Sequence, residues 1–355
     1  MSVLIICHCV CVCACVSLVL SQPLHRYCMT FQSVSANQLM SGLTFEDHFA
    51  ARAKDFSTAQ KMLQFLQTQP EILPGVTLVD LIGEPTGQSV VCRGTFAPVG
   101  GAQAQTRPVA VEVPVAVKIF LKITSAATSE IALLKRCNHP NIITLLSDID
   151  VRGIKVLVLP LASHSLSSVG LVNSPLDIVR YTLQVARALE YLHGAMGMSH
   201  LDVKAANVLV FPDGTVQLID FGLSCPYDPL VPRTIYDCGT PGFMSPETLH
   251  KVLGQPRASG DLSKVDMYAF GCLFWELMAG QPPYRREADE AGWSEARAKL
   301  VDRHSPGDML DPRWLRDGRR FICVLMKRCC AFDPTARPRA SEVVFAFRML
   351  DEGVV

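Results

Sequence analysis

His200-Leu-Asp-Val-Lys-Ala-Ala-Asn207 decides the fold of this chain, together with Val216-Gln-Leu-Ile-Asp220-Phe-Gly222 a few residues later. The apolar run Val208-Leu-Val and a turn at Pro212-Asp-Gly separate the two stretches, which predicts a loop, a hairpin and a second loop. Because a hairpin returns the chain to its starting edge, four polar side chains can meet there: Asp202, Lys204, Asn207 and Asp220.

These side chains indicate a site for a divalent cation and a phosphate group. Two carboxylates and an amide supply the oxygen ligands that Mg²⁺ prefers, and an ammonium group balances the charge of a phosphate. A carboxylate beside a hydroxyl nucleophile can also accept its proton. The alternative is a chance cluster of polar loop residues, and the order and short spacings of the set argue against it.

The two stretches resemble the catalytic loop and the Asp-Phe-Gly motif of the eukaryotic protein kinase family. The resemblance implies that Asp202 is the catalytic base, that Lys204 lies near the γ-phosphate, and that Asn207 and Asp220 bind the metal. It implies ATP and Mg²⁺ as cofactors, with Mn²⁺ as the alternative metal, and protein substrates as partners. The implied fold is α+β and bilobal, with a small β-rich N-lobe and a larger helical C-lobe.

A strand and a helix upstream of the catalytic loop carry the same resemblance. Val115-Ala-Val-Lys118 is similar to the third-strand motif, whose lysine holds the α- and β-phosphates. A lysine in an apolar strand is costly to bury unless it is paired. Glu130, on the next predicted helix, is the expected partner of Lys118.

Downstream, Gly239-Thr-Pro-Gly-Phe-Met-Ser-Pro-Glu247 resembles the end of the activation segment of these kinases. Asp266 and Arg337 match structural anchors of the family, and Arg337 would pair with Glu247. Lys204 follows Asp202 by two residues and Thr240 precedes Pro-Gly-Phe, which is typical of the serine/threonine class. The resemblance places Thr240 in contact with Asp202 and Lys204, as a third member of the catalytic group.

The resemblance also assigns residues to the nucleotide, with Leu159 as the gatekeeper; they are Gly83, Gly87, Val90, Ala116, Lys118, Glu130, Leu159, Leu161, Ala162 and Leu209. The glycine-rich loop departs from the family pattern, because Pro85 replaces its middle glycine and Gln88 its third. Proline has no N–H to offer a phosphate, so we expect weaker ATP binding. Pro160 in the hinge likewise offers only its carbonyl group.

Leu201 stands where an arginine usually precedes the catalytic aspartate. In much of the family that arginine holds a phosphorylated residue of the activation loop, and leucine offers no donor. Thr234 and Tyr236 are the residues that could be phosphorylated here. We therefore expect a kinase that is active without activation-loop phosphorylation.

A pseudokinase that acts as a binding or scaffold protein is the alternative function, and the irregular glycine-rich loop motivates it. Against it, the residues that a degraded enzyme usually loses are all present: Lys118, Glu130, Asp202, Asn207 and Asp220. These departures indicate a divergent kinase, and they suggest a large DNA virus as its source.

The composition of the 355 residues agrees with a globular protein, because 49 % are hydrophobic and 19 % charged. Lys plus Arg and Asp plus Glu are 33 each, without the basic excess of a nucleic-acid binder. The 14 cysteines form no C-x-x-C pair. Reduced, buried thiols in an intracellular protein of the cytoplasm or nucleus are the expected state.

The predicted organisation has three parts: residues 1–21 as an apolar leader, 22–75 as an N-terminal extension, and 76–350 as the kinase domain. Residues 4–20 carry no charge and approach the length that spans a bilayer. A signal, a membrane anchor and an unstructured leader all stay open for them, so membrane association is an open alternative. Within 22–75, apolar residues at helical spacing predict an amphipathic helix over 45–66.

Strands precede helices along the kinase domain, which favours the α+β class and two lobes, 76–161 and 162–350. Strands are predicted over 76–82, 89–92, 113–120 and 154–161, with an exposed loop at 97–108. Helices are predicted over 125–137, 175–193, 265–278 and 321–330.

Overall fold

The structure, a computed structural model, describes residues 56–86, 88–97, 112–151, 154–226, 239–252, 261–285 and 319–351, besides 288–289, 292, 306 and 310–315. These residues form two compact units. The first comprises the described residues of Met1–Ile123 and Asp148–Val158, and the second those of Thr124–Ser147 and Leu159–Val355. The predicted leader and residues 22–55 lie outside the described residues. Within the described ranges, no helix has the length and apolar character to cross a membrane.

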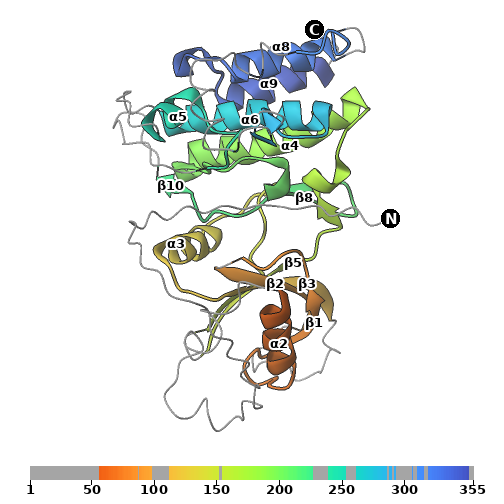
Figure 1. Cartoon of the computed structure of the whole chain (residues 1–355), viewed down its shortest axis with the longest axis vertical. Helices are drawn as coiled ribbons and strands as arrows, with labels where there is room; N and C mark the ends of the chain where they lie inside the picture. Colours follow the sequence, from red (N-terminus) through yellow and green to blue (C-terminus); the bar gives the residue numbers. More distant parts are fainter. Residues whose placement is uncertain are drawn as a thin grey trace, which may run out of the picture. The chain divides into compact units, whose positions relative to one another are not determined.

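The first unit is built on a five-stranded sheet with the order β1-β2-β3-β5-β4 (Figure 1). Its strands are β1 (Val76–Leu81), β2 (Ser89–Phe96), β3 (Val113–Phe120), β4 (Ser147–Val151) and β5 (Ile154–Pro160). Strands β1, β2 and β3 pair antiparallel. Four of the five strands were predicted. Strand β4 was not predicted, because two of the five residues in Ser-Asp-Ile-Asp-Val are aspartates, which are rare in strands.

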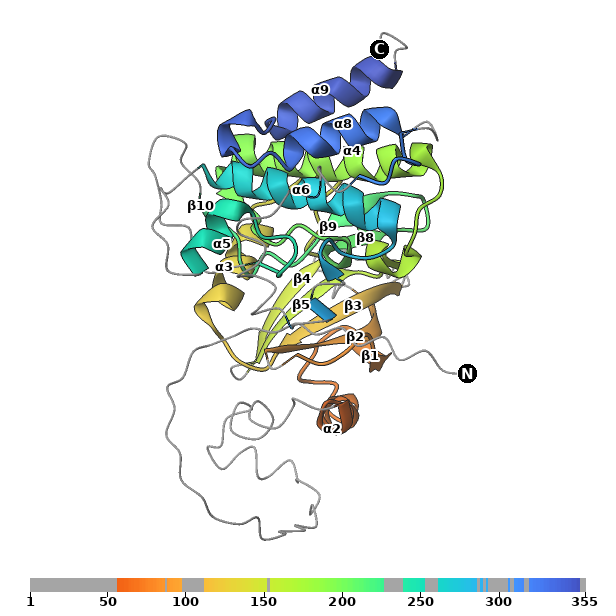
Figure 2. The ribbon, with the colours of Figure 1, turned by 45° about the horizontal axis from the view of Figure 1, so that its top comes forward.

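Helix α2 (Phe56–Gln67) covers one face of this sheet (Figures 1 and 2). Its buried residues recur at helical spacing, and they pack on alternate residues of the strands; on α2 they are Ala59, Met62, Leu63 and Leu66. Gln67 ties the end of the helix to β1, since its Nε2 donates to the carbonyl oxygens of Leu78 and Val79 at 3.1 and 3.0 Å. The helix begins within the predicted span 45–66; residues 45–55 lie outside the described residues.

The second unit is mainly helical, with α4, α6, α8 and α9 stacked side by side (Figures 1 and 2). Its helices are α3 (Ser125–Leu134), α4 (Pro175–Tyr191), α5 (Pro246–Val252), α6 (Leu262–Ala279), α8 (Arg320–Cys329) and α9 (Ala340–Asp351). The central helix is α6, which is buried around most of its circumference. Asp261 caps its start, and Gly280 ends it in the left-handed conformation.

Two small sheets of the second unit hold the loops of the predicted site. Strands β6 (His164–Ser165), β8 (Val208–Val210) and β9 (Val216–Leu218) form one sheet, and β8 and β9 are the predicted hairpin. Strand β7 (Met198–Ser199) pairs antiparallel with β10 (Cys225–Pro226) in the other. Strand β7 precedes the first motif, β8 and β9 connect the two motifs, and β10 follows the second, so the two sheets fix the position of both loops.

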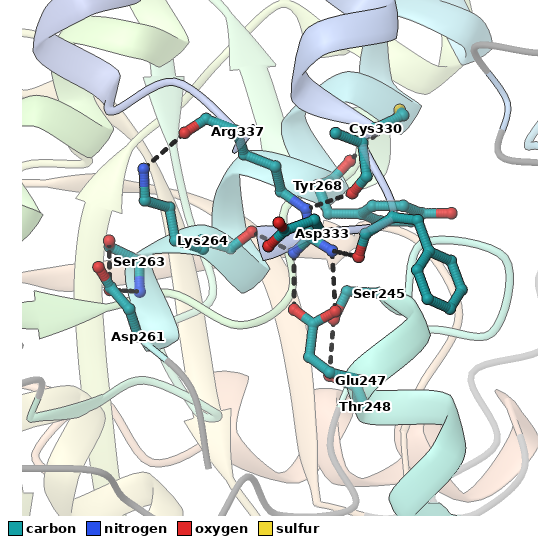
Figure 3. A network of polar contacts seen from close by, with 12 residues as sticks. Ser245, Glu247, Thr248, Asp261, Ser263, Lys264, Tyr268, Cys330, Asp333 and Arg337 are labelled. Carbon is teal, nitrogen blue, oxygen red and sulfur yellow. Dashed lines mark hydrogen bonds and ion pairs between the residues drawn. The ribbon is translucent and has the colours of Figure 1, made fainter. Parts of the chain in front are cut away.

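Arg337 joins α5, α6 and the segment before α9 through a buried network (Figure 3). Its Nη1 and Nη2 donate to the two carboxylate oxygens of Glu247 at 2.6 and 2.8 Å, which confirms the predicted pair. The guanidinium also donates to the carbonyl oxygens of Ala331 and Lys264, and it lies 5.0 Å from the ring of Tyr268. Because Arg337 is only 1 % exposed, these partners replace water around its charge.

Removing this guanidinium leaves the buried Glu247 without its counter-charge. We therefore expect Arg337→Met to lower the free energy of unfolding by roughly 3–5 kcal/mol, measured by urea denaturation. Arg313→Met is the matched control, because Arg313 pairs with Asp311 while 83 % exposed and exposed pairs contribute about 1 kcal/mol or less. Equal losses in the two variants would contradict a structural role for the Arg337 network.

Candidate active site

The loop before the predicted catalytic aspartate is held by Asp266 of α6, a fully buried side chain. Its Oδ1 accepts from the N–H of Leu201 at 2.7 Å, and its Oδ2 accepts from the N–H of His200 at 2.8 Å. His193, in the π-helical turn Leu192–Met196 (η3), places Nε2 2.8 Å from the same Oδ2. Leu201 has a φ of 67°, a left-handed conformation that costs a non-glycine residue on the order of 1–2 kcal/mol. The carboxylate therefore stabilises a strained backbone.

His200 links the two sequence motifs. Its Nδ1 accepts from the N–H of Asp202 at 3.2 Å, so its Nε2, 3.0 Å from the carbonyl oxygen of Ile219, carries the proton and donates. The imidazole also meets the ring of Phe221 edge-on, at 5.0 Å between centroids. In the sequence, the only signal for a role of this residue is its place as the first residue of the motif.

Asp202, Lys204 and Thr240 form one hydrogen-bonded group. The Nζ of Lys204 donates to Asp202 Oδ2 at 2.7 Å and to Thr240 Oγ1 at 2.6 Å. The hydroxyl of Thr240 in turn donates to Asp202 Oδ1 at 2.6 Å. The structure thus brings together the three residues predicted to act in catalysis, although Thr240 lies 38 positions after Asp202.

Asp202 is held in its ionised form. Burial alone would raise the pKa of its carboxyl, but the Lys204 ammonium and the hydrogen bonds from Lys204 and Thr240 outweigh burial and lower the pKa below its ordinary value. A carboxylate that stays ionised near neutral pH and lies beside an ammonium can accept a proton from a nearby hydroxyl.

Asn207 and Asp220 fit the ligand set of a hard divalent cation. The Nδ2 of Asn207 donates to the carbonyl oxygen and to Oδ2 of Asp202, both at 2.8 Å, which leaves its amide oxygen for a metal. The N–H of Ile219 donates to the carbonyl oxygen of Asn207 at 2.9 Å and brings the exposed Asp220 to the same edge. Among the described residues, no group of three His, Cys, Asp or Glu side chains is arranged to hold a metal ion by itself. Phosphate and water oxygens would therefore complete the coordination.

The predicted nucleotide residues of the second unit lie along one segment and its partner strand. Leu159, Leu161 and Ala162 are partly exposed where β5 leads to β6. The N–H of Ser163 donates to the carbonyl oxygen of Val210 at 2.9 Å, and Leu209 of β8 lies opposite Ser165. Glu130 is buried on α3, also in the second unit.

The first unit carries the remaining nucleotide residues on β2, β3 and the turn between β1 and β2. Gly83 adopts a φ of 71° just after β1, and Gly87 lies outside the described residues. Ala116 and Lys118 share one face of β3 and are partly exposed. Lys118 belongs to the first unit and Glu130 to the second, so their pairing stays a prediction.

Val90 differs from its predicted place. It lies opposite Ile119, and both belong to the core that α2 covers, whereas Val91 lies opposite Lys118. Directly paired residues point to the same face of a sheet. Val91 is therefore the valine on the face of Lys118. Shifting a strand by one residue exchanges its two faces. Val90 was placed by counting from the stretch Gly83 to Gln88, whose sequence departs from the family pattern, and this count was wrong by one residue.

Phe120 of β3 is a second feature of this sheet that sequence reasoning missed. The Nζ of Lys118 lies 5.2 Å from the centroid of the Phe120 ring, within the range of a cation–π contact. Residues two apart on a strand share a face, and this was the signal that could have identified it.

Glu276 of α6 is a further residue of the site. Its Oε2 accepts from the N–H of Ala205 at 2.9 Å, on the residue that follows Lys204. Burial raises the pKa of Glu276 to about 7, against the opposing effects of the Ala205 hydrogen bond and the Lys204 charge. The contact spans 71 positions, and no local pattern indicates it.

This pKa makes the stability of the wild-type protein depend on pH. Between the ordinary value of 4.5 and about 7, the folded state holds a proton that the unfolded state has released, so stability falls as the pH rises through this window. A glutamine at this position does not titrate. We compare the free energies of unfolding of Glu276→Gln and wild type by urea denaturation at pH 5 and at pH 8. The value for Glu276→Gln minus that for wild type should be roughly 2 kcal/mol higher at pH 8 than at pH 5.

Both proteins carry all the other carboxylates, so the contributions of those groups to the pH dependence of stability cancel when the two free energies of unfolding are subtracted. A difference between Glu276→Gln and wild type that stays constant from pH 5 to pH 8 would contradict the raised pKa.

Comparisons with known proteins agree with this geometry. A family model described as protein kinase domain matches residues 88–346. A probable cell division protein kinase of Encephalitozoon cuniculi is 29 % identical over 218 residues, which cover 61 % of this chain and 79 % of that protein. CBL-interacting protein kinase 4 of Oryza sativa is 30 % identical over 65 % of this chain and 54 % of its own length. The human serine/threonine-protein kinase DCLK2 is 33 % identical over 45 % of this chain and 20 % of its own length. This chain thus spans about half or less of the latter two proteins.

Proposed function

The chain belongs to the protein kinase family, and we propose that it is an active serine/threonine kinase that transfers the γ-phosphate of ATP to hydroxyls of other proteins. The observation that carries this proposal is the group of Asp202, Lys204 and Thr240, joined by three hydrogen bonds of 2.6–2.7 Å. The name of the similar human protein, serine/threonine-protein kinase DCLK2, supports the serine/threonine class.

Each member of this group has a distinct role in the proposed reaction. Asp202, held as a carboxylate, orients the substrate hydroxyl and accepts its proton. Lys204 places a positive charge beside it, where negative charge on the transferred phosphoryl group would be stabilised. Thr240 bonds to both side chains, so it fixes the distance between base and ammonium.

The family uses ATP and a divalent metal, and we propose Mg²⁺ as that metal. Asn207 and Asp220 would hold it through their oxygen atoms, and it would neutralise charge on the ATP phosphates when bound. In the first unit, Lys118 would hold the α- and β-phosphates, with Ala116 and Val91 on the same face of the sheet. We take residues 76–350 as the kinase domain, which contains the matched range 88–346.

The pseudokinase alternative finds no support in the site. Asp202, Lys204 and Asn207 are buried and satisfied by one another, and Asp220 lies at the same edge. Because ATP and Mg²⁺ are abundant inside cells, the proposal includes an intracellular location. Protein substrates complete it, and a viral origin stays a prediction.

Loss of the base or of the phosphate-holding lysine should abolish phosphate transfer. We expect Asp202→Asn and Lys118→Met each to lower the rate of transfer from labelled ATP by at least about 10³-fold, since each stabilises charge in the reacting complex. Asp213→Asn is the matched control, because this exposed aspartate only caps the hairpin turn at Thr215. Its rate should stay within about threefold of wild type. Near-normal turnover in Asp202→Asn would remove the basis of the enzyme proposal.

Leu201 bears on regulation. It is buried in an apolar cluster with Leu262 and Val265 of α6, and Cys225 packs against the cluster. An activation-loop phosphate would meet no donor from this side chain, so we expect phosphatase treatment to leave the rate of transfer nearly unchanged. Thr234→Ala and Tyr236→Phe, in a segment outside the described residues, should behave like wild type in the same assay. A loss of tenfold or more on dephosphorylation, about 1.4 kcal/mol of barrier, would contradict this.

A further inference from the structure

Helix α2 precedes the residues that the family model matches, yet it closes the core of the first unit. Its last residue, Gln67, donates to the carbonyl oxygens of Leu78 and Val79 on β1. We propose that Gln67 is a positioning residue for the nucleotide: it holds a bulge in β1 that turns Ile82 toward the face of the sheet that carries Lys118. This inference deepens the proposed kinase function and rests on it.

Strand β1 contains one extra residue relative to β2. Leu78 lies opposite Gly94 and Asp80 lies opposite Arg93, so Val79, which is 54 % exposed, is the extra residue. A bulge of this kind interrupts the hydrogen-bond ladder and bends the strand. The side-chain amide of glutamine has two N–H donors, and here it meets two carbonyl groups at the bulge. Gln67 therefore supplies donors at the point where the ladder is interrupted.

The backbones of β1 and β2 approach closely just before the bulge. A Cβ atom at Gly94 would lie 2.3 Å from the carbonyl oxygen of Thr77, so only glycine fits at this position. This contact holds β1 against β2 on one side of the bulge. A change in the bulge is therefore passed to the residues on its other side, which lead to the turn between the two strands.

The bulge exchanges the two faces of β1. Before it, Val76 and Leu78 are buried in the core that α2 covers. A regular strand would next turn Asp80 into this core, where an unpaired charge is costly. With the bulge, Leu81 lies opposite the buried Cys92 and packs against the core instead. The sequence thus favours a bulge here, and Gln67 fixes how the strand bends at it.

This exchange adds Ile82 to the residues that we assign to the nucleotide. Ile82 follows Leu81, so it points to the opposite face of β1, and its N–H donates to the carbonyl oxygen of Val91 at 2.8 Å. That face carries Val91, Ala116 and Lys118 on the neighbouring strands, and all four side chains are partly exposed. Loss of the Gln67 hydrogen bonds would loosen the bend and the position of Ile82 with it.

Two variants of one helix test the side-chain amide of Gln67. Gln67→Met keeps the length of the side chain and removes both donors. Gln64→Met is the matched control, because Gln64 is an exposed glutamine of the same helix. For each protein, amide hydrogen exchange of Ile82 and Ala97 is followed by NMR, and the Kd for Mg-ADP is measured by calorimetry. The kcat and the KM for ATP are measured with a degenerate serine/threonine peptide library.

The N–H of Ala97 donates to the carbonyl oxygen of Gly75 at 2.8 Å, at the end of the hairpin away from the turn, and so serves as the internal reference. We expect the Ile82 amide to exchange at least about fivefold faster in Gln67→Met than in wild type, while the Ala97 amide changes less than about twofold. The Kd for Mg-ADP and the KM for ATP should each rise at least about fivefold. The kcat should stay within about twofold, because this hairpin holds the nucleotide and not the reacting hydroxyl. Gln64→Met should match wild type in every measurement.

An unchanged rate of Ile82 exchange in Gln67→Met, or an unchanged Kd for Mg-ADP, would overturn the inference. Equal acceleration of Ile82 and Ala97 would overturn it as well, because it would show a general loss of stability. If Gln67→Met does not fold, Gln67→Asn takes its place, since its shorter side chain withdraws the donors from β1. A wild-type protein that binds Mg-ADP without transferring phosphate would refute the proposed function, and amide exchange and Mg-ADP binding would still decide the role of Gln67.

Discussion

The carboxylate of Asp266 is the constraint on which the site depends. A catalytic loop must present Asp202 to the substrate while its own backbone stays in place, and a loop lacks the ladder of hydrogen bonds that orders a strand or a helix. Asp266 replaces that ladder with two short bonds to the amides of His200 and Leu201 from inside a buried helix. The left-handed conformation of Leu201, which turns the chain toward Asp202, persists because both amides are held.

Once this backbone is fixed, the remaining contacts of the site follow in sequence. His200 connects this loop to the second motif by two hydrogen bonds. Its Nδ1 accepts from the N–H of Asp202, and its Nε2 donates to the carbonyl oxygen of Ile219. Asn207 and Lys204 both donate to Oδ2 of Asp202, and Thr240 donates to its Oδ1. Each of these side chains bonds to another member of the group, and a network of this kind is rigid because the loss of one bond leaves several groups unpaired.

The catalytic residues were predictable from the sequence because their spacing is local. A loop of eight residues and a short hairpin constrain Asp202, Lys204, Asn207 and Asp220 to one edge whatever the rest of the chain does. Features that depend on a register or on a distant helix were not predictable in this way. Val90 was assigned to the wrong face because a single residue in the preceding loop exchanges the faces of β2. The contact between Glu276 and Ala205 spans 71 positions and that between His193 and Asp266 spans 73, so only the folded chain brings these pairs together.

The burial of α6 explains how one helix can serve these distant contacts. Besides the loop, it contacts the Arg337 network through Lys264 and Tyr268 (Figure 3). It also contacts the end of α8 at Gly271. A Cβ atom at Gly271 would lie 2.4 Å from Cys330 Sγ and 2.9 Å from Cys329 Cβ, so glycine is required for α8 to pack this closely. A helix held on so many sides has little freedom to slide or rotate. Because Asp266 and Glu276 project from this same helix, the distance between the two ends of the catalytic loop is determined by the core of the second unit and not by the loop itself.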